Sequence, residues 1–145
     1  MDIHVMNSDE LYDETKLVSI TNFLHDHLGK YGDPREHIRM AIDYSLSRQK
    51  GRGGIVITAS EVDKILGAVV INETGMEGYI PANILVYIAV DESVRGKGIG
   101  KKLMETAIAN TQGGIALHVE PDNPAKKLYE KLGFTNKYLE MRLQQ

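Results

Sequence analysis

The stretch VRGKGIGKKL, residues 94–103, places three glycines among four cationic side chains. It follows the apolar run NILVYIAV (83–90) and leads into residues 98–110, whose apolar spacing predicts a helix. Glycine lets a chain turn tightly and lets its N–H groups approach a ligand. A helix start attracts anions through its free N–H groups and its dipole. The stretch therefore indicates either a phosphate-binding loop or a glycine-rich turn that carries solvated charges.

Two familiar phosphate loops do not fit the spacing of this stretch. A nucleoside-triphosphate loop, G-x-x-x-x-G-K-[ST], would need glycine at position 95 and Ser or Thr at position 102. The sequence has Arg95 and Lys102 there. A dinucleotide fingerprint, G-x-G-x-x-G, would need glycine where Lys101 or Leu103 stands. If the loop binds phosphate, it does so in neither of these two ways, and a pyrophosphate held by its N–H groups is the interpretation that remains.

Composition limits the class of protein. The chain has 145 residues, 42% of them hydrophobic and 26% charged, which is typical of a single soluble globular domain spanning 1–145. It has no cysteine, which excludes disulfides, thiolate metal sites and a cysteine nucleophile. The net charge of −3 argues against a nucleic-acid partner, which normally needs a basic face. The first residues do not look like a secretory signal, and no apolar run is long enough to span a membrane, so we expect a cytoplasmic protein without a membrane partner.

Apolar periodicity and glycine breaks predict the order β-α-α-β-β-β-α-β-α-β. This order is typical of a mixed α/β fold, with helices on both faces of a central mixed sheet. Asn7 or Ser8 is the predicted cap of the first helix, and Asp33 of the second. A short turn, EVD (61–63), predicts a hairpin. We expect strands at 2–6, 54–60, 64–73, 82–90, 115–120 and 134–143, and helices at 8–28, 34–50, 98–110 and 123–132.

Two motifs in the sequence resemble those of the GNAT acetyltransferase superfamily. Residues 95–100, RGKGIG, match its acyl-CoA-binding signature [RQ]-x-x-G-x-[GA]. Downstream, NPAKKLYEKLGF (123–134) resembles the family pattern N-x-x-A-x-x-[LF]-Y-x-x-x-G-F, with one residue fewer between Asn123 and Ala125. The predicted element order is similar to the family fold over essentially the whole chain.

The resemblance implies an N-acetyltransferase that moves the acetyl group of acetyl-CoA directly to a primary amine, without a metal. Backbone N–H groups of 95–100 would hold the CoA pyrophosphate. The pantetheine arm would pair with strand 82–90 like an added strand, at a bulge that splays it from 115–120. The implied cofactor-binding residues are Ile88, Ala89, Val90, Arg95, Gly96, Lys97, Gly98, Ile99, Gly100, Lys101, Asn123 and Lys126. A non-catalytic acyl-CoA sensor and an enzyme for longer acyl chains remain alternatives.

Two side chains are candidates for the proton transfers of this reaction. Tyr129 matches the family tyrosine that donates a proton to the departing thiolate, but its place on an apolar helix stripe also fits a core aromatic. Histidine is the side chain whose charge changes between about pH 5 and 8, so His118 is a candidate base. Alternation places His118 and Glu120 on the same side of a strand. A histidine that only packs beneath a loop is the other interpretation of His118.

The acceptor site is less well marked in the sequence. In this superfamily the connection of the first two helices and the loop before the central strand set specificity. Those segments correspond here to 29–36 and 74–81, which makes Tyr31, Glu77 and Tyr79 candidate wall residues. Tyr87 could face the acceptor or lie in the core, and Glu120 could orient His118 or attract a cationic amine. The partners expected are therefore acetyl-CoA and an amine acceptor. The C-terminal strand could pair within one chain or between two copies in a homodimer.

Overall fold

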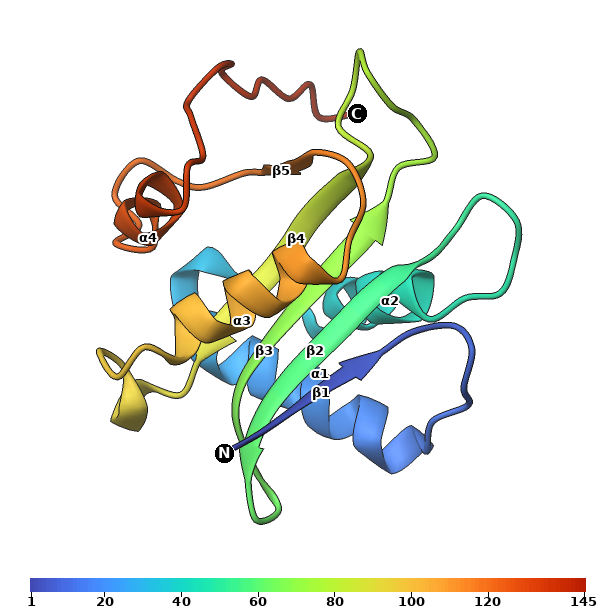
Figure 1. Cartoon of the computed structure of the whole chain (residues 1–145), viewed down its shortest axis with the longest axis vertical. Coiled ribbons are helices and arrows are strands. Elements are labelled where there is room, and N and C mark those ends of the chain that lie inside the picture. The colour runs from blue at the N-terminus through green and yellow to red at the C-terminus, as the bar shows by residue number, and fades with distance from the viewer.

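The computed structural model describes all 145 residues and contains one five-stranded sheet in the order β1-β2-β3-β4-β5. Neighbouring strands are antiparallel except β4 and β5, which are parallel. Figure 1 shows α1 and α2 behind the sheet and α3 in front of it, so the mixed α/β class is confirmed. The strands are β1 (Asp2–Met6), β2 (Gly54–Glu61), β3 (Lys64–Glu73), β4 (Asn83–Val90) and β5 (Ile115–Leu117); the α-helices are α1 (Glu14–Leu28), α2 (Arg35–Ser45), α3 (Ile99–Ala109) and α4 (Lys126–Lys131); the 3-10 helices are η1 (Gly29–Tyr31) and η2 (Glu92–Val94).

The sheet separates two hydrophobic clusters. Along β3, Ala68 and Val70 pack towards α1 and α2, whereas Val69 and Ile71 pack towards α3, and all four are fully buried. A strand covered on both faces reads as a continuous apolar run rather than an alternating one. This explains why residues 65–71 are almost uniformly apolar. None of the helices is both long and apolar enough to cross a bilayer.

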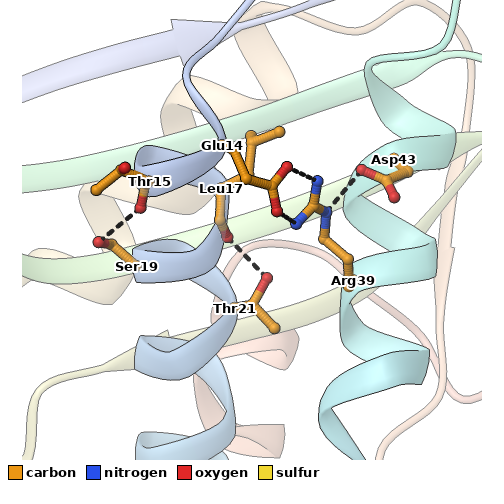
Figure 2. A network of polar contacts seen from close by, with 7 residues as sticks. All are labelled: Glu14, Thr15, Leu17, Ser19, Thr21, Arg39 and Asp43. Atoms are coloured by element: carbon orange, nitrogen blue, oxygen red, sulfur yellow. Dashed lines mark hydrogen bonds and ion pairs between the residues drawn. The ribbon is translucent and has the colours of Figure 1, made fainter.

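A charged network ties α1 to α2 across the back of the sheet (Figure 2). The Arg39 guanidinium donates to both Glu14 carboxylate oxygens, at 2.6 and 2.7 Å, and to Asp43 Oδ1 at 2.8 Å. Hydrogen bonding to Arg39 lowers the pKa of Glu14. A bidentate pair of this kind fixes geometry that a lysine cannot reproduce. It therefore holds together the two helices whose connection lies beside the candidate site.

Several helix bounds differ from the sequence prediction: α2 ends at Ser45 rather than near residue 50, and α4 begins at Lys126 rather than at 123. Helix α1 begins at Glu14 rather than near residue 8, because Asn7 instead accepts the Asp9 N–H at 2.9 Å and donates its own N–H to the Tyr12 hydroxyl. Helix α2 begins at Arg35 after Pro34, and the Asp33 carboxylate does not cap it. Local side-chain hydrogen bonds thus compete with helix initiation at such residues.

The predicted sixth strand, residues 134–143, is wrong. No strand forms after α4, and the only backbone hydrogen bond from this part of the chain is that from Phe134 N–H to Tyr129 C=O at 3.0 Å. Strand β5 ends at Leu117 instead of residue 120. A strand needs a neighbouring strand that pairs with its backbone N–H and C=O groups. With only three residues, β5 is too short to be that neighbour for residues 134–143.

A strained residue in the β2–β3 turn gives a stability prediction. Val62 has φ 54° and a side chain 93% exposed, so it holds a left-handed backbone without any packing in return. That conformation costs a non-glycine residue roughly 1–2 kcal/mol, and asparagine tolerates it better. We expect Val62→Asn to raise the free energy of unfolding by about 1 kcal/mol, measured by urea denaturation. An unchanged or lower midpoint would contradict the assignment of strain.

Candidate functional site

The loop between β4 and α3 presents a row of backbone N–H groups without protein partners. Gly96 and Gly98 have φ values of 81° and 84°, which favour glycine. The first helical bond of α3 runs from Lys102 N–H to Gly98 C=O at 3.0 Å. The N–H groups of residues 96–101 donate to no backbone or side-chain acceptor. We call this row the amide cradle; it can bind an anion.

The start of α3 carries positively charged side chains, whereas negatively charged ones are favoured near a helix N-terminus. Lys101 lies in the first turn with Lys102 next to it, no acidic residue lies there, and Gly98 supplies no side-chain cap. Cations near a helix N-terminus are unfavourable because they meet the positive end of the dipole. A bound anion would remove this penalty. The arrangement therefore favours the phosphate interpretation over a merely solvated turn.

Two side chains fix the entrance to the amide cradle. Asp91 Oδ1 accepts the N–H and hydroxyl of Ser93 at 2.8 and 2.7 Å, and these bonds lower the pKa of Asp91. Arg95 donates from Nε to Val90 C=O at 3.0 Å and from Nη2 to His27 C=O at 2.9 Å. The guanidinium of Arg95 is therefore anchored to β4 and to the end of α1.

A β-bulge in β4 separates it from β5. Val70 pairs with Tyr87 and Ile71 with Leu85, so Val86 is the extra residue. Leu85 packs towards α3, whereas Tyr87, two positions later, packs towards α1 and α2. The bulge therefore reverses which side chains face which layer. Strand β5 pairs only with residues 83–85, so beyond the bulge this edge of β4 has no neighbouring strand.

The open edge of β4 exposes alternate backbone groups. Asp91 N–H donates to Leu66 C=O of β3 at 2.8 Å. In an antiparallel ladder every second residue points its N–H group to the same neighbouring strand. Ile88 and Val90 therefore direct their N–H groups away from β3, towards the open edge. Ala89 is a correction to the predicted set, because its backbone groups point to Ala68 of β3 instead. The edge can accept an extended, amide-containing ligand beside Ile88 and Val90.

Helix α4 places Tyr129 against α3. The Leu128 side chain of α4 lies over the first turn of α3, where a Cβ on Gly100 would be 3.4 Å from Leu128 Cδ2. Tyr129 is 6% exposed, its ring packs near Phe134, and burial raises its pKa to about 12. Its hydroxyl has no hydrogen-bond partner in the protein and is not among the fully buried unpaired atoms. Tyr129 is thus a core aromatic whose neutral hydroxyl is free to donate a proton.

Polar groups from four segments lie beyond the bulge. The buried Tyr87 hydroxyl donates to Asp33 Oδ2 at 2.5 Å, and burial together with this carboxylate raises the pKa of Tyr87. His118, directly after β5, has an exposed side chain with Nδ1 3.8 Å from Glu140 Oε1. Its partner is therefore Glu140, not Glu120, and no loop covers it. Tyr31 donates to Asp122 C=O at 3.3 Å, which joins the α1–α2 connection to the loop after β5.

A family model for the acetyltransferase (GNAT) domain matches residues 52–136, more than half of the chain. The chain belongs to the GNAT acetyltransferase family. The matched range runs from the start of β2 to just past α4, and so includes the amide cradle, the bulge and Tyr129.

This GNAT domain is similar to a phage protein and to solved structures of other proteins. A 5-NmdU N-acetyltransferase of Pseudomonas phage PaMx11 is 39% identical over 57 residues, which are 38% of this chain and 41% of the phage protein. The match therefore spans less than half of that relative. A solved ribosomal-protein-alanine N-acetyltransferase from Brucella melitensis biovar Abortus 2308 superposes with a TM-score of 0.67 at 14% identity, over 99% of this chain and 98% of that one. The solved structure of the NatC complex bound to Gag peptide and CoA superposes with a TM-score of 0.72 at 22% sequence identity, over 95% of this chain and 87% of that one. These two structures show the shared fold.

The GNAT site gathers some predicted residues and leaves others apart. Asn123 accepts the Ala125 N–H at 2.9 Å and so shapes the turn before α4, where the half-buried Lys126 begins the helix; Lys97 is exposed on the cradle. Glu77 lines an open pocket of about 930 Å³ between the β3–β4 loop and the α3–β5 loop. No other predicted site residue lines that pocket, and Tyr79 is 81% exposed. The structure does not bring Glu77 to the cradle.

Two residues near the GNAT site, Asp33 and Glu140, were not predicted as site residues from the sequence. Asp33 was predicted only as a helix cap, and it becomes the partner of Tyr87 because the bulge turns that tyrosine towards α2. Glu140 lies in a segment predicted as a strand, and no local pattern links it to His118.

Proposed function

We propose that this GNAT domain is an N-acetyltransferase that transfers the acetyl group of acetyl-CoA to a primary amine. The observation that carries the proposal is the amide cradle, unpaired at residues 96–101, in line with the open edge of β4. A pyrophosphate fits the cradle, and the amides of the pantetheine arm fit the N–H groups of Ile88 and Val90. The phage relative, an N-acetyltransferase by name, supports the same reaction class.

The proposed reaction is a direct displacement. The neutral amine nitrogen attacks the thioester carbonyl, forming a C–N bond, and the oxyanion receives a hydrogen bond from an N–H of the open β4 edge. The C–S bond then breaks. Tyr129 donates its proton to the departing thiolate, and His118 accepts the proton that the amine loses. Glu140, 3.8 Å from His118, stabilises the protonated imidazole.

A thiol-release assay with a panel of amines tests the proposal. Acetyl-CoA should be consumed only when an amine is present, with one free thiol released per acetyl group transferred. Parallel calorimetry separates two failures. Saturable acetyl-CoA binding without turnover on any amine would identify an acyl-CoA sensor instead. Faster turnover with longer acyl chains would correct the donor, while leaving the cradle assignment intact.

The role of His118 gives a separate prediction. His118→Gln should lower kcat by about 100-fold, because general base catalysis contributes typically 10²–10⁴-fold, and should remove the fall in rate at acidic pH. His37, exposed on α2 without a side-chain hydrogen bond, supplies the control His37→Gln, which should leave the pH–rate profile unchanged. Identical profiles for wild type and His118→Gln would show that the base lies elsewhere.

A further inference from the structure

A pocket of about 310 Å³ lies between α1 and the strands at the β1 end of the sheet. Its floor includes Thr58, which faces the same side of the sheet as the residues packed against α1, and His4, which pairs with Thr58 across β1 and β2. Lys16 and Ile20 line it from α1. No residue of the amide cradle or of the open β4 edge lines this pocket, so it is separate from the GNAT site.

Thr58 is a buried residue whose hydroxyl has no hydrogen-bond partner in the protein. It is 5% exposed and lines the pocket, and its hydroxyl is not among the fully buried unpaired atoms, so the hydroxyl opens into the pocket. Thr21, 6% exposed on α1, shows the usual arrangement, because its hydroxyl donates to Leu17 C=O at 2.7 Å. The Thr58 hydroxyl is therefore available to a molecule that enters the pocket.

Lys16 places a half-buried ammonium group at the same pocket. Its Nζ donates to His4 Nδ1 at 3.0 Å and lies 5.8 Å from the centre of the Tyr12 ring. No carboxylate oxygen lies within 4.0 Å of this ammonium. A lysine ammonium has three donors, so two remain after the bond to His4. A half-buried cation without a counter-charge favours an anionic ligand.

The other polar side chains of the pocket define the charge that it accepts. Ser60 lies two positions after Thr58 on β2 and adds a half-buried hydroxyl on the same face. The Ser19 hydroxyl already donates to Thr15 C=O at 2.9 Å (Figure 2). Asp63, in the β2–β3 turn, is the only carboxylate that lines the pocket. One cation and one carboxylate suit a small ligand of low charge better than a polyanion.

We propose that this pocket binds a small oxyanion, a carboxylate or a phosphate, through Lys16 Nζ and the hydroxyls of Thr58 and Ser60. Hydrogen bonds from an ammonium to an oxyanion are charge-assisted and therefore strong. The pocket volume lies at the lower end of the range for small-molecule sites, which fits a ligand much smaller than acetyl-CoA. This site goes beyond the proposed acetyl transfer and does not depend on it.

Titrations of the isotope-labelled protein with sodium acetate and with sodium phosphate, at constant ionic strength, test the proposal. At least one anion should shift the amide resonances of Thr58 and Ser60 saturably. A response to acetate alone would identify a carboxylate site, and a response to phosphate alone a phosphate site. Acetamide, the neutral counterpart of acetate, should leave both resonances unmoved. No saturable shift with either anion, or equal shifts with acetamide, would overturn the proposal.

Four variants test which groups hold the anion. Lys16→Met and Thr58→Val should each weaken its binding by about tenfold or more, because each removes a hydrogen bond to a charged group. Asp63→Asn should strengthen binding roughly twofold, because it removes an exposed like charge. Thr21→Val is the matched control: it also removes a buried threonine hydroxyl, but one that does not line the pocket, and should leave the affinity unchanged.

Two further measurements keep these results interpretable. Thr58→Val should unfold at no lower urea concentration than wild type, because the lost hydroxyl has no partner in the protein, so weaker binding would not reflect unfolding. All four variants should keep the wild-type affinity for acetyl-CoA, which separates failure of this site from failure of the cradle. Anion binding that survives both Lys16→Met and Thr58→Val unchanged would overturn the proposal.

Discussion

Gly98→Val is expected to weaken acetyl-CoA binding at least tenfold. Gly98 holds φ 84° as the N-cap of α3, and a Cβ there would meet nothing within 4 Å. The cost of valine is therefore conformational and not steric. A left-handed backbone costs such a residue roughly 1–2 kcal/mol, so the loop should relax and lose the alignment of its N–H groups. Binding of acetyl-CoA must then restore the alignment. Each cost of about 1.4 kcal/mol weakens the affinity tenfold.

Gly51→Val is the matched control for this prediction. Gly51 has φ 88°, an equally open surrounding, and a place in the α2–β2 loop. It should show a similar loss of stability but no change in the dissociation constant measured by titration calorimetry. If both variants bind acetyl-CoA as tightly as wild type, the cradle geometry is not what holds the ligand.

Tyr129→Phe is expected to lower kcat by about 100-fold with little change in the KM for acetyl-CoA, because general acid catalysis typically contributes 10²–10⁴-fold. The pKa of about 12 keeps the hydroxyl protonated throughout the neutral range, so the proton is available to a leaving thiolate. The ring remains in place, because phenylalanine keeps the packing against α3 and Phe134. An unchanged kcat at full stability would restrict Tyr129 to a core role.

Burial of Tyr129 also predicts a pH dependence of stability. Its folded pKa, about 12, is above the ordinary value of 10.0, so the neutral form favours the folded state. The contribution is fully present below pH 10 and is lost as the pH rises through about 12; by linkage it amounts to roughly 2–3 kcal/mol. In alkaline urea titrations wild type should lose this stability and Tyr129→Phe should not. Parallel curves for the two proteins would contradict the assignment.

The element order up to β5 could be predicted because each element has its own local signal. These signals are local patterns: the apolar runs of β3 and β4, the EVD turn and the glycines before α3. The strands that end at Met6, Glu73 and Val90 end where the sequence predicted. The cradle was predicted for the same reason, since turn and helix start are adjacent in the sequence. The expectation that the cradle holds the pyrophosphate of CoA came from the two motifs that resemble those of the family.

The parts that could not be predicted depend on contacts between distant segments. The family resemblance implied a bulge in this strand, but its position at Val86 is a difference of register between β3 and β4, and that position turns Tyr87 towards Asp33. The pairing of His118 with Glu140 joins the end of β5 to the C-terminal segment. The failed strand at 134–143 has strand-like composition, but composition does not show whether a partner strand exists within the same chain.

The amide resonances of the isotope-labelled protein, followed during an acetyl-CoA titration, report directly which N–H groups contact the ligand. We predict saturable shifts concentrated at residues 96–101 and at Ile88 and Val90, with Ala89 much less affected because its N–H is already bonded to β3. CoA without the acetyl group should reproduce the shifts at 96–101. Binding that left those resonances unmoved, or the absence of saturable binding, would contradict the claim that these amides hold the pyrophosphate.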